Sequence, residues 1–196
     1  MKPFRSVTGR AAVLDRNDVD TDQIVPKQFL KRIERTGYGE FLFYDWAQDP
    51  AFELNRPQAA RAKILLAGRN FGCGSSREHA VWALQDYGFE VLIAASYADI
   101  FVSNCVKVGL VPIVLPAAQV KALMEAAAAG RELTVDLEAQ TIADPAGTTI
   151  AFEVDPFQRR CLLEGLDDIA RSLEHESEIA AFEAAHPAAI ATTALS

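Results

Sequence analysis

The chain has 196 residues, 50% of them hydrophobic and 23% charged, and this composition predicts one globular domain with an ordinary buried core. The formal net charge of −8 argues against nucleic acid and acidic membrane surfaces as partners. No apolar run reaches the roughly 20 residues that a membrane helix needs, and residues 1–5 lack the apolar core of a secretory signal, so we expect a cytoplasmic protein.

The first third of the chain has little regular periodicity. Residues 5–14 alternate loosely between apolar and polar and predict a first strand, which an acidic loop over residues 15–22 follows. Residues 27–60 mix aromatic and polar residues with glycines and prolines and have no long period. Because structureless loops of this length are uncommon, we expect residues 27–60 to be an excursion with short helices that contacts substrate or a partner.

Strands and helices alternate from residue 63 onward. Short apolar runs predict buried strands at residues 63–67, 90–95 and 111–115. Helical spacing of apolar residues, ended by glycines, predicts helices at residues 78–87, 96–107 and 116–130. We expect Ser96 to be the N-cap of the second of these helices.

The end of the chain is expected to combine a hairpin with helices. Alternating apolar residues predict two paired strands, 133–137 and 150–154, around a turn at residues 144–147. Pro156 starts a helix that Gly165 ends, and a further helix extends from residue 167 toward residue 186. We therefore predict a three-layer α/β domain over residues 1–165, with a helical tail over residues 166–196.

A glycine-rich turn lies between the predicted strand 63–67 and the predicted helix 78–87. Gly72 and Gly74 permit backbone angles and close approaches that a side chain would prevent. Ser75 and Ser76 stand where N-cap residues belong, next to amide groups that have no partner within the helix. Such a helix N-terminus attracts anions, so the turn predicts an anion-binding site.

Arg77 adds a planar set of donors that can hold a carboxylate in a bidentate manner. Other glycine-rich sites do not fit these residues. A phosphate loop would need a lysine in the turn, and a dinucleotide fingerprint would need glycine where Arg77 stands. Neither serine has a glycine two residues further on, so the turn is not a hydrolase nucleophile elbow.

The segment around Gly-Ser-Ser-Arg-Glu-His-Ala resembles the active-site turn in the swivelling domain of the aconitase family, and in particular the isopropylmalate dehydratase small subunits. Other segments resemble the same family in the same order: residues 18–30, 35–39, 86–89, 98–104 and 155–167. The resemblance implies a β/β/α swivelling domain of the aconitase type with a mixed sheet. It also implies the small subunit of an isomerase of leucine biosynthesis, which interconverts 2- and 3-isopropylmalate by dehydration and rehydration.

The resemblance assigns roles to residues of the turn. Ser75 matches the family's base, which acts as an alkoxide and takes a proton from the carbon next to a carboxylate. Ser76 and Arg77 match residues that bind substrate carboxylates. The turn is supported by Gly72, Gly74 and His79.

A second substrate-binding arginine occurs in the family, and the basic segment 27–35 is the place where we expect it. Arg35 is our choice, with Lys31 and Arg32 as alternatives. A run of basic residues is also commonly a solvated helix face, so the segment alone does not decide between these uses.

The family reaction uses a [4Fe-4S] cluster, and this chain is not expected to hold it. Its three cysteines, Cys73, Cys105 and Cys161, are far apart in sequence and lack cluster spacing. A large subunit that carries the cluster is therefore implied, with the two chains forming a heterodimer. Two alternatives stay open. One is a related hydro-lyase acting on citramalate, citraconate or a homoaconitate-type acid, and the other is a non-catalytic anion-binding module.

Overall fold

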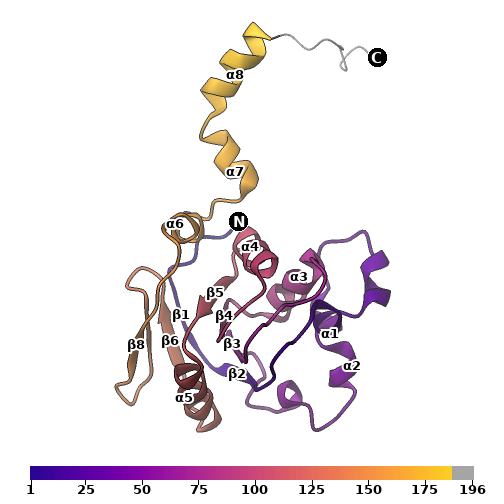
Figure 1. Ribbon diagram of the computed structural model, residues 1–196, viewed down its shortest axis with the longest axis vertical. Helices are drawn as coiled ribbons and strands as arrows, with labels where there is room; N and C mark the ends of the chain where they lie inside the picture. The colour runs from indigo at the N-terminus through magenta and orange to yellow at the C-terminus, as the bar shows by residue number, and fades with distance from the viewer. Residues whose placement is uncertain (187–196) are drawn as a thin grey trace.

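The computed structural model describes residues 1–186 and contains two sheets of four strands each. One sheet is parallel throughout, with the order β2 (Ala11–Leu14), β3 (Ile64–Ala67), β4 (Val91–Ala94) and β5 (Val111–Val114) (Figure 1). Every residue of β3 and β4 is buried, as expected for central parallel strands that are covered on both faces.

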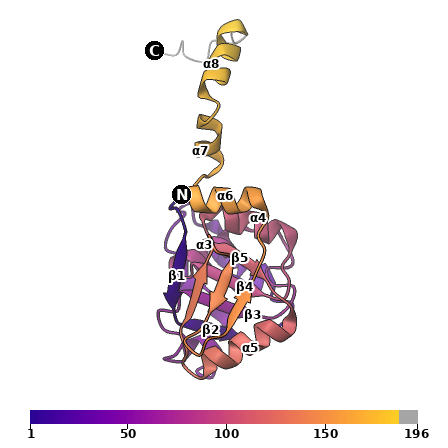
Figure 2. The ribbon, with the colours of Figure 1, turned by 90° about the vertical axis from the view of Figure 1, so that its left-hand side faces the viewer.

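The second sheet is antiparallel, with the order β1 (Ser6–Gly9), β6 (Leu133–Asp136), β7 (Thr141–Ala143) and β8 (Thr149–Ala151) (Figure 2). The predicted hairpin was wrong in its pairing, because β7 lies between β6 and β8 and pairs with both. β7 is short and contributes only Ile142 to the core, so its apolar pattern is too weak to detect.

The single strand predicted at residues 5–14 is two strands in different sheets. Arg10 alone separates β1, which pairs with β6, from β2, which pairs with β3. The backbone is extended in both strands. An extended segment with one apolar face has the same sequence pattern whether it pairs with one sheet or passes from one sheet to another. This segment therefore joins the two sheets directly.

The two sheets and the helices form three layers. The strands of the parallel sheet follow one another in sequence, so right-handed crossovers place their connections on one face. That face carries α3 (Glu78–Tyr87), α4 (Asp99–Val108) and the excursion, whereas the antiparallel sheet and α5 (Ala117–Ala128) cover the other (Figure 1). The predicted β/β/α architecture is confirmed, with parallel and antiparallel pairing separated into different sheets.

The excursion between β2 and β3 contains short helices, as predicted. They are η1 (Lys27–Lys31), η2 (Gly39–Phe41), α2 (Tyr44–Ala47) and η3 (Glu53–Asn55), and α1 (Thr21–Ile24) lies between β2 and the excursion. Aromatic side chains organise the excursion and hold it to the domain: Phe29 stacks on Phe41 at 4.1 Å between ring centroids, and Tyr38 contacts Trp82 of α3 at 5.8 Å. Tyr38 and Phe43 are fully buried, so the excursion forms part of the core.

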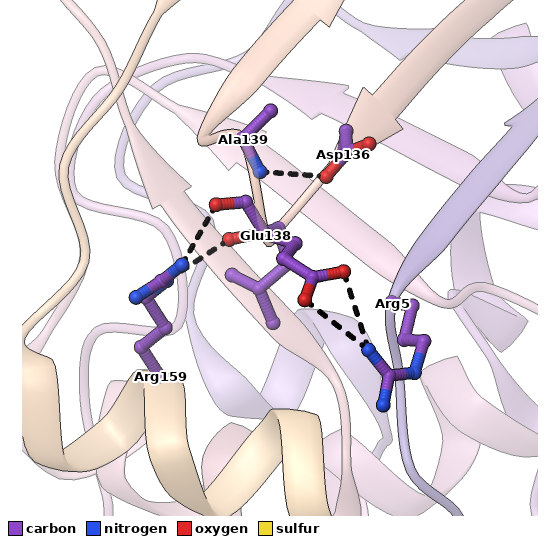
Figure 3. A network of polar contacts seen from close by, with 6 residues as sticks. Arg5, Asp136, Glu138, Ala139 and Arg159 are labelled. Carbon is purple, nitrogen blue, oxygen red and sulfur yellow. Dashed lines mark hydrogen bonds and ion pairs between the residues drawn. The ribbon is translucent and has the colours of Figure 1, made fainter.

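Helix α6 (Pro156–Glu164) lies across the end of the antiparallel sheet (Figure 2). Arg159 fixes it there, since its Nε and Nη2 atoms donate to the carbonyls of Leu137 and Glu138 at 3.1 and 2.7 Å (Figure 3). The carboxylate of Glu138 in turn accepts from Arg5, which precedes β1, at 3.2 Å (Figure 3). These contacts join three segments that are distant in sequence.

Two further helices extend away from the sheets, namely α7 (Asp168–Leu173) and α8 (Glu176–Ala185) (Figure 1). The prediction of a single helix from residue 167 toward residue 186 was wrong, because the helix is interrupted between Leu173 and Glu176. The division at residue 165 stays a prediction, and residues 187–196 of the predicted tail lie outside the described residues. Among the helices of residues 1–186, none has both the length and the apolar content to cross a bilayer.

Candidate active site

Three segments meet at the carboxyl edge of the parallel sheet: the one after β2, the turn after β3 and the start of α4 after β4. In open α/β sheets ligands bind outside the carboxyl ends of the strands, where the loops that leave the strands lie. Here they enclose a cavity of about 240 Å³, lined by Thr21, by residues 72–77 of the turn except Cys73, and by residues 98–101 and Asn104 of α4.

Backbone hydrogen bonds hold the turn to both neighbouring segments. The amide of Gly72 donates to the carbonyl of Val19 at 2.8 Å, and the amide of Thr21 donates to the carbonyl of Cys73 at 3.0 Å. On the other side, the amide of Ala98 donates to the carbonyl of Phe71 at 3.1 Å. The position of the turn is therefore fixed by the loops that follow β2 and β4.

Two glycines shape the turn. Gly72 has φ +75° and Gly74 has φ +87°, in the left-handed region that other residues rarely adopt. A Cβ atom at Gly72 would also overlap the ring of Phe101, which packs directly against the backbone. Both glycines thus lie where the sequence predicts special backbone geometry.

The two serines of the turn do not cap α3, so this part of the prediction was wrong. The N-cap residue is Arg77, with extended backbone at φ −134° and ψ 112°, and no side chain bonds to the first amides of the helix. Ser75 and Ser76 precede the cap, are exposed and line the cavity. The carbonyl of Ser75 accepts from Oγ1 of Thr21 at 2.8 Å, which orients the serine backbone.

The predicted cap of α4 was also wrong. Its N-cap residue is Ala98, and again no side chain bonds to the first amides. Ser96 instead accepts a hydrogen bond from the amide of Asn70 through its Oγ at 2.8 Å. Both helices that begin at the cavity therefore leave their N-terminal amides free of side-chain caps.

Arg77 is the cation of the cavity, and Asp22 of α1 orients it. Nη1 of Arg77 forms a charged hydrogen bond with Oδ1 of Asp22. The Arg77 side chain is 17% exposed and that of Asp22 is 51% exposed, so the guanidinium is the more enclosed partner. A guanidinium has five N–H donors, and this contact leaves others for a ligand.

His79 lies under the excursion next to the turn. Its ring contacts the rings of Tyr38 and Trp82, at 5.2 and 4.7 Å between centroids. Burial against these rings lowers the pKa of His79. The negative charge of Glu78 partly opposes this effect, and the positive charge of Arg77 lowers the pKa further. A neutral imidazole that packs between aromatic rings suits the predicted supporting role.

Arg35 lies outside the cavity lining. Its side chain is exposed, with the guanidinium 5.6 Å from the ring centroid of Trp82. The alternative Arg32 pairs with Glu40 at 3.2 Å, and Lys31 ends η1 as an exposed residue. The structure thus brings Ser75, Ser76 and Arg77 together around one cavity, while these three basic residues lie elsewhere in the excursion.

Two buried polar residues of the cavity were not predicted from the sequence. Among residues 1–186 only two polar residues are buried, Thr21 at 2% and Asn104 at 7% exposed, and both line it. A polar residue on the buried face of a helix is a detectable signal, and Asn104 follows the apolar Ile100 and Phe101 at helical spacing. Its significance becomes visible only when the turn is placed beside α4.

The residues of this chain do not fit an iron–sulfur cluster. Within residues 1–186, no group of three or more His, Cys, Asp or Glu side chains could hold a metal ion. Such clusters need thiolates. Burial raises the pKa of Cys105, and burial together with the charges of Asp20 and Asp18 raises the pKa of Cys73, so both thiols stay protonated.

Comparisons with known proteins agree with this architecture. A family model described as Aconitase C-terminal domain matches residues 1–118, and a second, LeuD_N, matches residues 121–156. The 3-isopropylmalate dehydratase small subunit of Acidobacterium capsulatum is 56% identical over 188 residues, which cover 95% of this chain and 91% of that protein. The protein of the same name from Bacillus licheniformis is 57% identical over 190 residues, covering 93% and 96%.

The chain belongs to the family of 3-isopropylmalate dehydratase small subunits. A crystal structure of 3-isopropylmalate dehydratase from Methanocaldococcus jannaschii superimposes with a TM-score of 0.67 at 29% identity, covering 91% of this chain and 99% of that one. Membership in this family, with its aconitase relationship, suggests an iron–sulfur enzyme. The name of these small subunits implies that they work with a large subunit.

Proposed function

We propose that this chain is the small subunit of a hydro-lyase that interconverts 2- and 3-isopropylmalate in leucine biosynthesis. The observation that carries the proposal is the 54–57% identity, over at least 93% of the chain, to proteins named 3-isopropylmalate dehydratase small subunit. The cavity supports it, because it presents serines, an arginine and two helix N-termini, which are groups suited to a small acid.

Ser76 and Arg77 bind a carboxylate of the substrate. They lie at the start of α3, where the free amides and the helix dipole favour negative charge. Arg77 can present two parallel donors to a carboxylate while Asp22 holds the other side of its guanidinium. The carboxylate thus gains charge neutralisation and a defined orientation from one short segment.

Ser75 removes a proton from the carbon next to a carboxylate. A serine hydroxyl is a weak base in water, so its anion requires stabilisation by neighbouring groups. Three such groups are near: the turn amides, the N-terminus of α3 and the guanidinium of Arg77. Because Ser75 is exposed in this chain alone, a covering partner is required to exclude water from the reaction.

The partner in this proposal is a cluster-bearing large subunit. The [4Fe-4S] cluster belongs to that chain, since the three cysteines here are separate and two have raised pKa values. The glycine-rich turn and the excursion form the contact with it, because the turn lines the cavity and the excursion packs against α3, which follows the turn. The heterodimer is cytoplasmic, where a reducing environment preserves the free thiols.

Reconstitution tests the function. The purified chain is expected to be colourless, free of iron and inactive on isopropylmalate, and to give an active enzyme when combined anaerobically with its large subunit. Assays with citramalate and homoaconitate-type acids distinguish the related hydro-lyases. Iron and dehydratase activity in the isolated chain would contradict the proposal, and so would tight phosphate binding with no activity in the complex.

A further inference from the structure

Asn104 is a buried polar residue of the cavity that the roles given above do not use. It is 7% exposed and comes from the second turn of α4, opposite the glycine-rich turn. Within residues 1–186 the carboxamide of Asn104 has no hydrogen-bond partner. Because no polar side-chain atom of these residues is both fully enclosed and unpaired, the carboxamide is not sealed inside the protein. The carboxamide therefore faces the space of the cavity, with donors and an acceptor available to a ligand.

The N-terminus of α4 opens on the same space. This helix has 10 residues, and its N-cap residue Ala98 provides no side-chain bond to the first amides. Residues 99–101, which carry those amides, line the cavity together with Ala98, whose own amide donates to Phe71. Unsatisfied amides and the helix dipole favour an anion at this position. Asp99 is the carboxylate of the lining, and its side chain is exposed, where water screens its charge.

A dicarboxylate needs two places for its charges, and Arg77 with the start of α3 provides one. Arg35, which we expected to provide the second, lies outside the cavity over Trp82. The start of α4 lies beside the start of α3, because the helices follow the adjacent strands β3 and β4. A volume of about 240 Å³ suits a small acid that reaches both helix N-termini.

We infer that Asn104 and the N-terminus of α4 form a second carboxylate subsite, which binds the substrate carboxylate that Ser76 and Arg77 do not hold. This inference rests on the proposed function, because it takes the ligand to be a dicarboxylate. The carboxamide NH₂ of Asn104 donates to the carboxylate, together with the free amides of α4. Asn104 is thereby a substrate-binding residue.

The test uses the enzyme reconstituted with its large subunit and the variant Asn104→Asp, which keeps the shape and replaces the donor by a carboxyl group. We expect KM for isopropylmalate to rise at least about 10-fold near neutral pH. The rise should diminish at lower pH, as the introduced carboxyl group becomes protonated. Inhibition by a dicarboxylate such as malate should weaken in parallel, whereas inhibition by a monocarboxylate such as 2-hydroxyisocaproate, which occupies the Arg77 subsite alone, should not.

Two further variants complete the design. Asn17→Asp adds the same charge at an exposed position outside the cavity, where the Oδ1 that accepts from the amide of Arg69 is retained, and KM should stay unchanged. Asn104→Leu removes the polar group without adding charge, and we expect a smaller rise in KM that does not depend on pH. Thermal unfolding and assembly with the large subunit are measured for each variant.

The outcomes separate the two proposals. If the unaltered complex does not act on isopropylmalate, the proposed function fails regardless of Asn104. If it acts, and Asn104→Asp has an unchanged KM or weakens mono- and dicarboxylate inhibitors equally, the second subsite is overturned alone. Failure of both Asn104 variants to fold or assemble would assign the carboxamide a structural partner and would also overturn it.

Discussion

Helices α3 and α4 begin differently from helices α6 and α7. Asp155 accepts hydrogen bonds from the amides of Phe157 and Gln158 at the start of α6, and Asp167 accepts from the amide of Ala170 at the start of α7. At the cavity, α3 and α4 begin at Arg77 and Ala98, and neither has a side-chain cap. The two pairs of helices satisfy their terminal amides in different ways.

A helix start with a side-chain cap is stabilised by the protein itself, whereas a helix start without one can bind a ligand. A side-chain cap stabilises a helix by about 1 kcal/mol, so an end without one leaves stabilisation available to a ligand. A missing cap is not sufficient by itself, because α5 also begins at Pro116 without one and borders no part of this cavity. What distinguishes the cavity is that two such ends meet there, together with Ser75, Ser76 and Arg77.

Replacing the serine that we assign as base should have the largest effect. In Ser75→Ala, turnover of isopropylmalate should fall by about 10²–10⁴-fold while folding and assembly with the large subunit persist, because an exposed hydroxyl is lost and no cap is removed. Steady-state assays of the complex measure the loss. The matched control is Ser103→Ala on the exposed side of α4, which should retain full activity. Turnover within about tenfold of the parent would exclude Ser75 as the base.

Arg77→Lys should lower kcat/KM by about 10²-fold, equivalent to about 2.7 kcal/mol, since a lysine ammonium cannot reproduce a bidentate carboxylate contact. The kinetic constants of the reconstituted complex measure it. Arg171→Lys, in the exposed helix α7, is the control and should have no effect on kinetics. Unchanged kcat and KM in the first variant would leave Arg77 as a structural partner of Asp22.

Arg35→Gln tests whether the excursion contributes to the same site. If Arg35 binds substrate in the complex, kcat/KM should fall by at least about 10-fold, equivalent to about 1.4 kcal/mol, and Lys27→Gln should do much less. The stack of Arg35 on Trp82 gives it a defined position that exposed Lys27 lacks. Equal and small effects at both positions would identify the basic segment as a surface feature and direct attention to Lys31 and Arg32.

Exchanging the two kinds of helix start should produce small effects of opposite sign. Ala98→Ser gives α4 a cap, which should stabilise the fold by about 0.5–1 kcal/mol and raise KM a few-fold, because the hydroxyl occupies amides that a substrate would use. Asp155→Ala removes a cap from α6 and should destabilise the fold by about 1 kcal/mol without changing KM. Denaturant unfolding and kinetics of both variants measure the two effects. A lower KM for Ala98→Ser would contradict the role of α4.

The sequence predicted the C-terminal ends of helices better than their beginnings. Gly88, Gly109 and Gly165 end helices as expected, and each has a left-handed backbone. That signal is local, since glycine alone tolerates the conformation easily. At the N-termini of α3 and α4, serines were assigned as caps, but the loops from β2 and β4 fix the backbone there and place the serines elsewhere.

The site itself was predicted only in part. The glycine-rich turn could be recognised because its residues are consecutive. Thr21 and Asn104 reach the cavity from segments about 50 and 30 residues away in sequence, and only tertiary packing brings them to the turn. The division of the first strand had the same cause, since changing sheets at Arg10 alters its partners but not its local pattern.

The single-residue link at Arg10 also affects local unfolding of the protein in solution. β1 and β2 are edge strands of different sheets, yet one residue separates them, so neither can detach without pulling the backbone of the other. Cooperative units of this kind exchange their amide hydrogens together. The amides of β1 and β2 are therefore expected to exchange in a single event with the same denaturant dependence.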